Sequence, residues 1–156
     1  MPKAMGLDES SKVTSGPIMK EEAKEEGGEE QLNKQEVADF RGIEARANYL
    51  AQNRSDIQFV AKEICRDMAV PRATSWLRLN RLARYVLQDP RVVWTFSAID
   101  EEDLEYFDAH TDSDWAGCLL TRKSTSGGAL AIGGGTVRTW SSTQGTVAMS
   151  SGEAEY

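Results

Sequence analysis

Residues 111–156 read TDSDWAGCLLTRKSTSGGALAIGGGTVRTWSSTQGTVAMSSGEAEY, and this stretch sets the fold class. Two short runs, 126–132 and 136–142, flank the triple glycine 133–135. Short runs joined by glycines are typical of a β-hairpin, because glycine adopts the positive φ angles that a tight turn needs. The sequence therefore predicts two strands joined by a turn in this region.

Further elements are expected on both sides of this hairpin. An extended pattern over 104–112 predicts a preceding strand, and the run VVWTF at 92–96 predicts another short one. Ser150 and Glu153 have the spacing of a capping box, in which each side chain binds the other residue's backbone N–H at a helix start. Strands followed by a helix, with helices upstream, indicate an α+β fold.

Charge is unevenly spread along the 156 residues. The net charge of −7 divides into −4 over residues 1–33, +4 over 34–91 and −7 over 92–156. The basic middle segment is the one electrostatic indication of an anionic partner. The two cysteines lack paired spacing, which is typical of reduced thiols in an intracellular protein of the cytoplasm or the nucleus. No apolar run approaches the roughly 18 residues of a membrane span, so no membrane partner is expected.

Upstream of the strands, apolar spacing predicts three helices, at about 34–51, 55–70 and 74–88. Ser55 is the expected N-cap of the second helix, which should end before Pro71. On the first helix, either Ile43 or Glu44 fits the apolar face. Residues 1–33 contain the run KEEAKEEGGEE and are expected to form a disordered acidic arm. The predicted domains are this arm (1–33), a helical segment (34–91) and an α+β segment (92–156).

The third predicted helix carries Arg78, Arg81 and Arg84 on the face opposite its apolar residues. Two interpretations of this pattern are open. The arginines form either a solvated face above a core face, or a face that tracks the phosphates of a nucleic acid.

Acidic residues gather near the end of the chain. Asp112 and Asp114 are two residues apart, and Glu153 and Glu155 lie about 200° apart around a helix. Hard cations such as Mg²⁺ bind carboxylate oxygens, and a converging set could support two-metal hydrolysis of a phosphodiester. Acidic residues near turns and helix starts are also commonly caps or solvated groups, and the pattern alone leaves both interpretations open.

Several motifs near the end of the chain resemble those of a known family. The motifs DSDWAG, TRKSTSGG, the glycine turn, TW-SS and TVAMSSGEAEY occur in order over 112–156, and together they resemble the ribonuclease H domain of Ty1/copia-type retrotransposon Pol polyproteins. The segment 47–86 is similar to the region between the reverse transcriptase and that domain. Arg54-Ser55-Asp56-Ile57 has serine where the family commonly has proline. The resemblance covers about 36–156.

The resemblance implies a helical connection or thumb-like segment followed by an incomplete ribonuclease H-like β-β-β-α unit. It implies that Asp112 and Glu155 are catalytic ligands of Mg²⁺ or Mn²⁺, with Asp114 as a further ligand or supporting residue. The implied partners are an RNA/DNA hybrid or other nucleic acid and the remainder of the Pol polyprotein. Arg122 and Lys123 follow the strand motif and either contact a phosphate backbone or lie in a solvated turn.

Two further aspartates of the family pattern have no counterpart before Tyr156, nor does the paired-aspartate motif of the reverse transcriptase. The parent activity would be RNA-directed DNA synthesis joined to metal-dependent cleavage of RNA in hybrids. We expect this chain alone to be inactive. The alternatives are a nucleic-acid-binding module without catalysis, and a non-functional transposon relic that does not fold stably. Whether a longer product continues past Tyr156 is a separate question, which the sequence leaves open.

Overall fold

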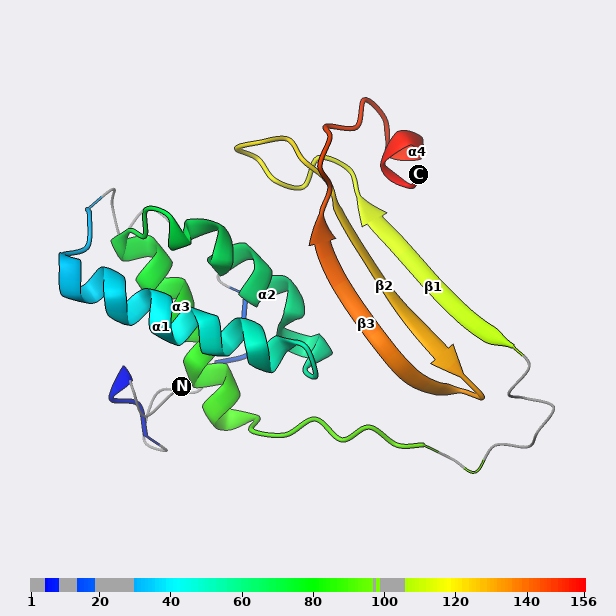
Figure 1. The fold of residues 1–156 in the computed structure, drawn as a ribbon, viewed down its shortest axis with the longest axis horizontal. Coiled ribbons are helices and arrows are strands. Elements are labelled where there is room, and N and C mark those ends of the chain that lie inside the picture. The colour runs from blue at the N-terminus through cyan, green and yellow to red at the C-terminus, as the bar shows by residue number, and fades with distance from the viewer. Residues whose placement is uncertain (1–4, 9–13, 19–29, 97, 99–105) are drawn as a thin grey trace. The chain divides into compact units, whose positions relative to one another are not determined.

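The computed structural model describes residues 5–8, 14–18, 30–96, 98 and 106–156 (Figure 1). The chain divides into two compact units, Met1–Val92 and Val93–Tyr156, and each is considered by itself. None of the helices in the described ranges is long and apolar enough to cross a membrane. The structure combines helices with an antiparallel sheet, as the α+β prediction requires.

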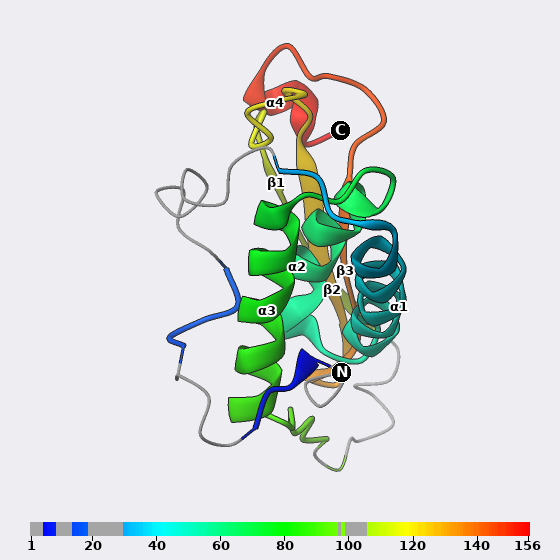
Figure 2. The same ribbon diagram turned by 90° about the vertical axis from the view of Figure 1, so that its left-hand side faces the viewer.

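The first unit is helical. Helix α1 spans Lys34–Ala51, α2 spans Ser55–Cys65, and α3 spans Ala73–Gln88. Figure 2 shows the three helices packed side by side. The three predicted helices are confirmed, but the second is shorter than expected. After Cys65 the chain tightens into the 3₁₀ turn η3, Arg66–Met68, so the α-helix ends well before Pro71.

Helix α1 begins at Lys34, as predicted, whereas the start of α2 differs from the sequence prediction. Asn33 caps α1: its side chain accepts a hydrogen bond from Glu36 N at 2.9 Å, and the Glu36 carboxylate accepts one from Asn33 N at 2.8 Å. This capping box was not predicted. Ser55 is not the N-cap of α2. That position belongs to Arg54, and Ser55 is already helical. Helix α2 therefore begins without a serine cap. Instead, the Arg54 side chain binds Asp56 in the first turn of the helix.

A single hydrophobic core joins the helices of this unit. The rings of Phe40 on α1 and Trp76 on α3 lie 6.2 Å apart in a tilted arrangement. Burying such apolar surface contributes about 25 cal/mol per Å² removed from water. The largest fully buried apolar side chains come from all three helices: Phe40, Ile57, Ile64, Leu79 and Leu82.

Parts of the predicted acidic arm contact the helices. Thr14 N donates to Gln88 Oε1 at 3.1 Å, and Arg81 Nε donates to Gly16 O at 2.9 Å. At the other end of α3, Ala73 N donates to Glu30 O at 3.1 Å. These contacts involve only residues 14, 16 and 30 of the arm, and the expectation of a disordered arm stays a prediction. Residues 19–29, which hold most of the charged run, lie outside the described residues.

The second unit contains a three-stranded antiparallel sheet. Its strands are β1 (Phe107–Asp114), β2 (Thr125–Ile132) and β3 (Gly135–Thr143), in the spatial order β1-β2-β3. The turn between β2 and β3 consists of Gly133 and Gly134, whose φ angles are 52° and 76°. Two positive φ angles define the primed turn that matches the twist of a hairpin. The predicted hairpin is confirmed.

Two strand predictions need correction. The strand expected at 92–96 is absent: these residues are irregular, and Val93 is 82% exposed. A β-branched run becomes a strand only where a neighbouring strand pairs with it, and no described strand pairs with this one. The strand expected over 104–112 lies at Phe107–Asp114 instead, and residues 104 and 105 are outside the described ranges.

Candidate metal and nucleic-acid site

The two aspartates of the first motif lie at the end of β1. Asp112 pairs in register with Gly127, and Asp114 pairs with Thr125. Successive side chains of a strand point to opposite faces, so these two aspartates share a face of the sheet. Both are exposed. The Asp112 carboxylate accepts a hydrogen bond from Ser113 N at 2.9 Å.

Asp114 is tied into the turn that follows β1. Its carboxylate accepts a hydrogen bond from Thr125 N on the neighbouring strand. A Cβ added at Gly117 would overlap Asp114 Oδ2, so only glycine leaves room for this carboxylate. Ala116 between them has a φ of 53°. The Asp-Trp-Ala-Gly string therefore forms a turn that the Asp114 carboxylate closes.

The loop from β1 to β2 presents the basic pair. Ser124 is fully buried, and its hydroxyl accepts a hydrogen bond from Ala116 N at 3.0 Å. Arg122 N donates to Cys118 O at 2.7 Å, and Arg122 has a φ of 56°. Arg122 is exposed and Lys123 is half-buried. The buried serine thus fixes the base of a loop that places both cations next to the carboxyl end of β1.

Helix α4, Ser151–Ala154, starts where the capping signal predicts a helix. Ser150 Oγ accepts a hydrogen bond from Glu153 N at 3.1 Å, which confirms half of the capping box. The reciprocal half is wrong, because the Glu153 carboxylate accepts from Met149 N at 2.7 Å rather than from Ser150 N. Glu153 is thereby occupied in the cap, which leaves Glu155 as the carboxylate that follows this helix.

Residues that directly follow β1 and β3 hold the segment that carries α4. Trp115 Nε1 donates to Ala148 O at 3.1 Å, and Gln144 donates to Ala154 O. Ala154 is buried, and α4 lies against β1 near the strand's carboxyl end (Figure 1). Glu155 directly follows α4 and is exposed. The elements that carry Asp112 and Glu155 are therefore neighbours.

The carboxylates at the end of β1 and around α4 do not fit a firmly held pair of metal ions. In the described part of the chain, no three or more His, Cys, Asp or Glu side chains are grouped so that they could hold a metal ion. Two-metal sites need several carboxylates that converge on ions about 3.5–4 Å apart. Asp112 and Glu155 could supply only part of such a set, with Asp114 already engaged in its turn.

The basic face of α3 is largely engaged within its own unit. Arg78 Nη1 lies 3.2 Å from Asp67 Oδ2 in an ion pair, and Arg81 donates to Gly16 O. Arg84 Nε is buried and finds no hydrogen-bond partner among the described residues. All three arginines are half-buried. They do not form an open row of cations.

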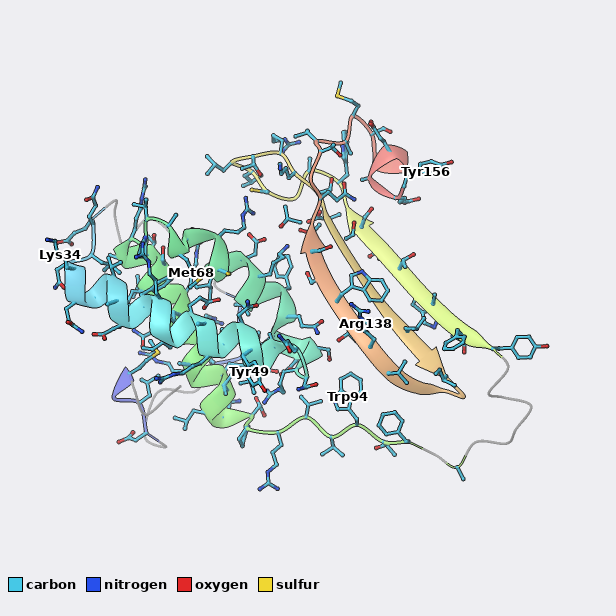
Figure 3. All side chains as sticks on the ribbon, in the orientation of Figure 1. Lys34, Tyr49, Met68, Trp94, Arg138 and Tyr156 are labelled. Carbon is cyan, nitrogen blue, oxygen red and sulfur yellow. The ribbon has the colours of Figure 1, made fainter. Side chains whose placement is uncertain are left out.

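One basic residue of the second unit was not singled out from the sequence. Arg138 is exposed on β3, where it pairs in register with Leu130 (Figure 3). It lies two residues from Trp140 and so shares that residue's face of the sheet. Its position within a predicted strand of alternating faces was the signal that could have identified it.

Comparison with known proteins identifies the relatives of this chain. It is 34% identical over 119 residues to the uncharacterized mitochondrial protein AtMg00810 of Arabidopsis thaliana, covering 76% of this chain and 48% of that protein. It is 37% identical over 86 residues to the secreted RxLR effector protein 161 of Plasmopara viticola, covering 55% and 58%. It is 30% identical over 118 residues to the retrovirus-related Pol polyprotein from transposon RE2 of A. thaliana, covering 76% and 8%.

These matches define a class: the chain is a relative of transposon-encoded Pol sequences. The predicted recognition of a copia-type retrotransposon Pol segment is confirmed. The chain spans about half the length of the first two relatives and a small part of the Pol polyproteins. No family model matches the chain, and no solved structure matches it.

Proposed function

We propose that the chain corresponds to the junction between the reverse transcriptase and ribonuclease H regions of a copia-type retrotransposon Pol polyprotein. In this proposal the unit Val93–Tyr156 is a ribonuclease H-like β-β-β-α unit, and the unit Met1–Val92 is the connection or thumb-like segment. The parent activity is RNA-directed DNA synthesis with metal-dependent cleavage of RNA in RNA/DNA hybrids.

The single observation that carries the proposal is the placement of two carboxylates on adjoining elements. Asp112 lies on β1, the first strand of an antiparallel sheet, and Glu155 directly follows α4, which packs against β1. The parent class implies an aspartate on the first strand and a glutamate in the first helix. The order of elements and the position of Asp112 agree with that pattern, whereas Glu155 lies one residue beyond α4 rather than within it.

We further propose that this chain does not hydrolyse hybrids by itself. Mg²⁺ or Mn²⁺ would supply water activation and charge stabilisation in the parent enzyme. Here Asp112 and Glu155 are exposed, Asp114 closes a turn, and Glu153 caps α4. Such a set offers too few converging oxygens to position a pair of cations.

A cleavage assay tests this proposal. The full chain is incubated with a hybrid of end-labelled RNA and DNA, with either Mg²⁺ or Mn²⁺, beside an Asp112→Asn variant as the matched control. We expect both proteins to give the same background. Metal-dependent product from the unmodified chain that disappears in Asp112→Asn would overturn the proposed inactivity while supporting the assignment of the site.

A second candidate is nucleic-acid binding without catalysis. The exposed position of Arg122, beside Lys123 in a loop fixed by buried Ser124, favours this loop over α3 as the contact. Each phosphate contact adds about 0.9 to the slope of log affinity against log salt for a duplex. Replacing both Arg122 and Lys123 with neutral residues should lower the magnitude of that slope by roughly two. Binding that depends instead on Arg78 would argue for the helix.

A further inference from the structure

One ionisable side chain in the helical unit has no role in the site described above. Glu44 on α1 is fully buried, with 0% of its surface exposed. Both of its carboxylate oxygens lack a hydrogen-bond partner among the described residues. It follows Phe40 by one helical turn and precedes Ala47, and both of these are core residues. A carboxyl group therefore occupies a position of the apolar stripe of α1.

Among the described residues, the groups that act on Glu44 do not neutralise it. The charged group that acts on it from η3 is Asp67, another acid. The cation Arg78 of α3 is paired with that same Asp67 at 3.2 Å. From α2, the thiol of Cys65 faces the same region and is influenced by Glu44. Arg41 on α1 is bound to backbone oxygens at the end of η3 and just after it, at 2.8 Å to Met68 O and 3.0 Å to Ala69 O.

A carboxylate in this place would be costly. Burial without hydrogen bonds disfavours the ionised form of an acid, and a neighbouring anion disfavours it further. Desolvation, followed by the charge of Asp67, raises the pKa of Glu44 from 4.5 to about 8. In neutral solution the folded unit therefore holds Glu44 as the uncharged acid.

We propose that the helical unit is a proton-linked fold, in which protonation of Glu44 stabilises the packing of α1 against α2 and η3. Ionisation of Glu44 in mildly alkaline solution weakens this packing and loosens the unit. No other ligand is involved, because the folded state itself binds the proton more tightly than the unfolded chain does.

The direction of the effect follows from linkage. The folded unit holds the proton more tightly than the unfolded chain does, so this contribution to stability is complete below the unfolded pKa of about 4.5. It is lost as pH rises through the window from about 4.5 to about 8. Within that window the equilibrium constant for unfolding rises by up to about tenfold per pH unit.

The experiment follows unfolding of the full chain in urea, by the helical circular dichroism signal, from pH 5 to pH 9. The unmodified chain is compared with Glu44→Gln, which fills similar space but cannot ionise. Glu30→Gln is the matched control, because Glu30 is exposed on the same unit. If Glu44→Gln does not fold, Glu44→Leu replaces it.

We expect the ratio of the unfolding constants of the unmodified chain and Glu44→Gln to grow by a factor on the order of 1,000 across this window. The same ratio for Glu30→Gln should stay flat. A carbon-13 titration of the Glu44 carboxyl in the folded chain should show a midpoint near pH 8. Parallel pH profiles for the unmodified chain and Glu44→Gln, or a carboxyl midpoint near 4.5, would overturn the proposal.

Discussion

Arg54 and Asp56 form a two-pronged ion pair at the start of α2. Arg54 Nε lies 2.9 Å from Asp56 Oδ1, and Arg54 Nη2 lies 2.7 Å from Asp56 Oδ2. The same Nη2 donates to Asp89 O at 2.8 Å, just beyond the end of α3. This pair therefore fastens the beginning of α2 to the end of α3. Within the Arg-Ser-Asp-Ile string, Arg54 and Asp56 have a structural role.

Replacing Arg54 with lysine should destabilise the helical unit by about 1–3 kcal/mol, because a lysine keeps the charge but cannot reproduce the planar fork. One or more of the three hydrogen bonds is then lost from a nearly buried position. Urea unfolding monitored by circular dichroism measures the change. Arg46→Lys is the matched control, since Arg46 is exposed on α1 and should shift stability by less than about 0.5 kcal/mol. Equal effects at both positions would refute the structural role.

The same pair predicts a loss of stability in acid. The hydrogen bond from Arg54 is the main cause that lowers the pKa of Asp56, and a hydrogen bond from Tyr85 acts in the same direction. A lowered folded pKa contributes stability that is present above the unfolded value of about 3.8 and is lost as pH falls through the folded pKa. Urea unfolding measured between pH 2 and pH 5 should show this loss of stability. In Asp56→Asn, stability should depend less on pH over the same range. The same loss of stability in acid for Asp56→Asn and the unmodified chain would contradict the role given to this ion pair.

Two neighbouring glycines of β2 should respond differently to alanine. A Cβ at Gly128 would overlap the ring of Trp140 on β3 and lie 2.8 Å from His110 O on β1. A Cβ at Gly127 would meet only Trp140 O, at an ordinary 3.7 Å. Gly128→Ala should therefore cost about 1–3 kcal/mol in the sheet, and Gly127→Ala close to nothing. Hydrogen exchange of the β2 amides gives the comparison, and similar exchange in both variants would be the contrary result.

The two units should unfold separately, with the sheet first. The core of the helical unit contains large side chains such as Phe40 and Leu79, whereas the buried apolar residues in the described part of the second unit are alanines. Small buried side chains remove little apolar surface from water and so contribute little stability. Thermal melts should show β-sheet loss below the helical transition. A single sharp transition for both signals would contradict this, and no cooperative transition at all would favour the relic interpretation.

The sequence predicted those elements whose signals are local. Apolar spacing indicated the three helices, and glycines that tolerate positive φ indicated the hairpin turn. The prediction of a strand at 92–96 was wrong because strand formation depends on pairing with a partner that is distant in the sequence. The engagement of Arg78 and Arg81 was missed for the same reason, since Asp67 and Gly16 lie on other segments. The capping box of α1, by contrast, has local spacing and could have been recognised.

Glu44 illustrates the limit of periodicity. Apolar spacing on α1 allowed either Ile43 or Glu44 on the inner face. Both are in fact buried. The width of the inner face depends on how α2 and α3 pack around α1, and that packing is set by contacts far apart in the sequence.

Paramagnetic broadening by Mn²⁺ tests the central claim most directly, namely that Asp112 and Glu155 share one incomplete ribonuclease H-like site. In amide spectra of the full chain, we expect Mn²⁺ to broaden signals beside Asp112 and beside Glu155 at the same concentration. That concentration should be high, because the ligands are few, and Asp112→Asn should reduce both effects together. Broadening confined to one of the two residues, or centred on another acidic group such as Asp67, would contradict the account.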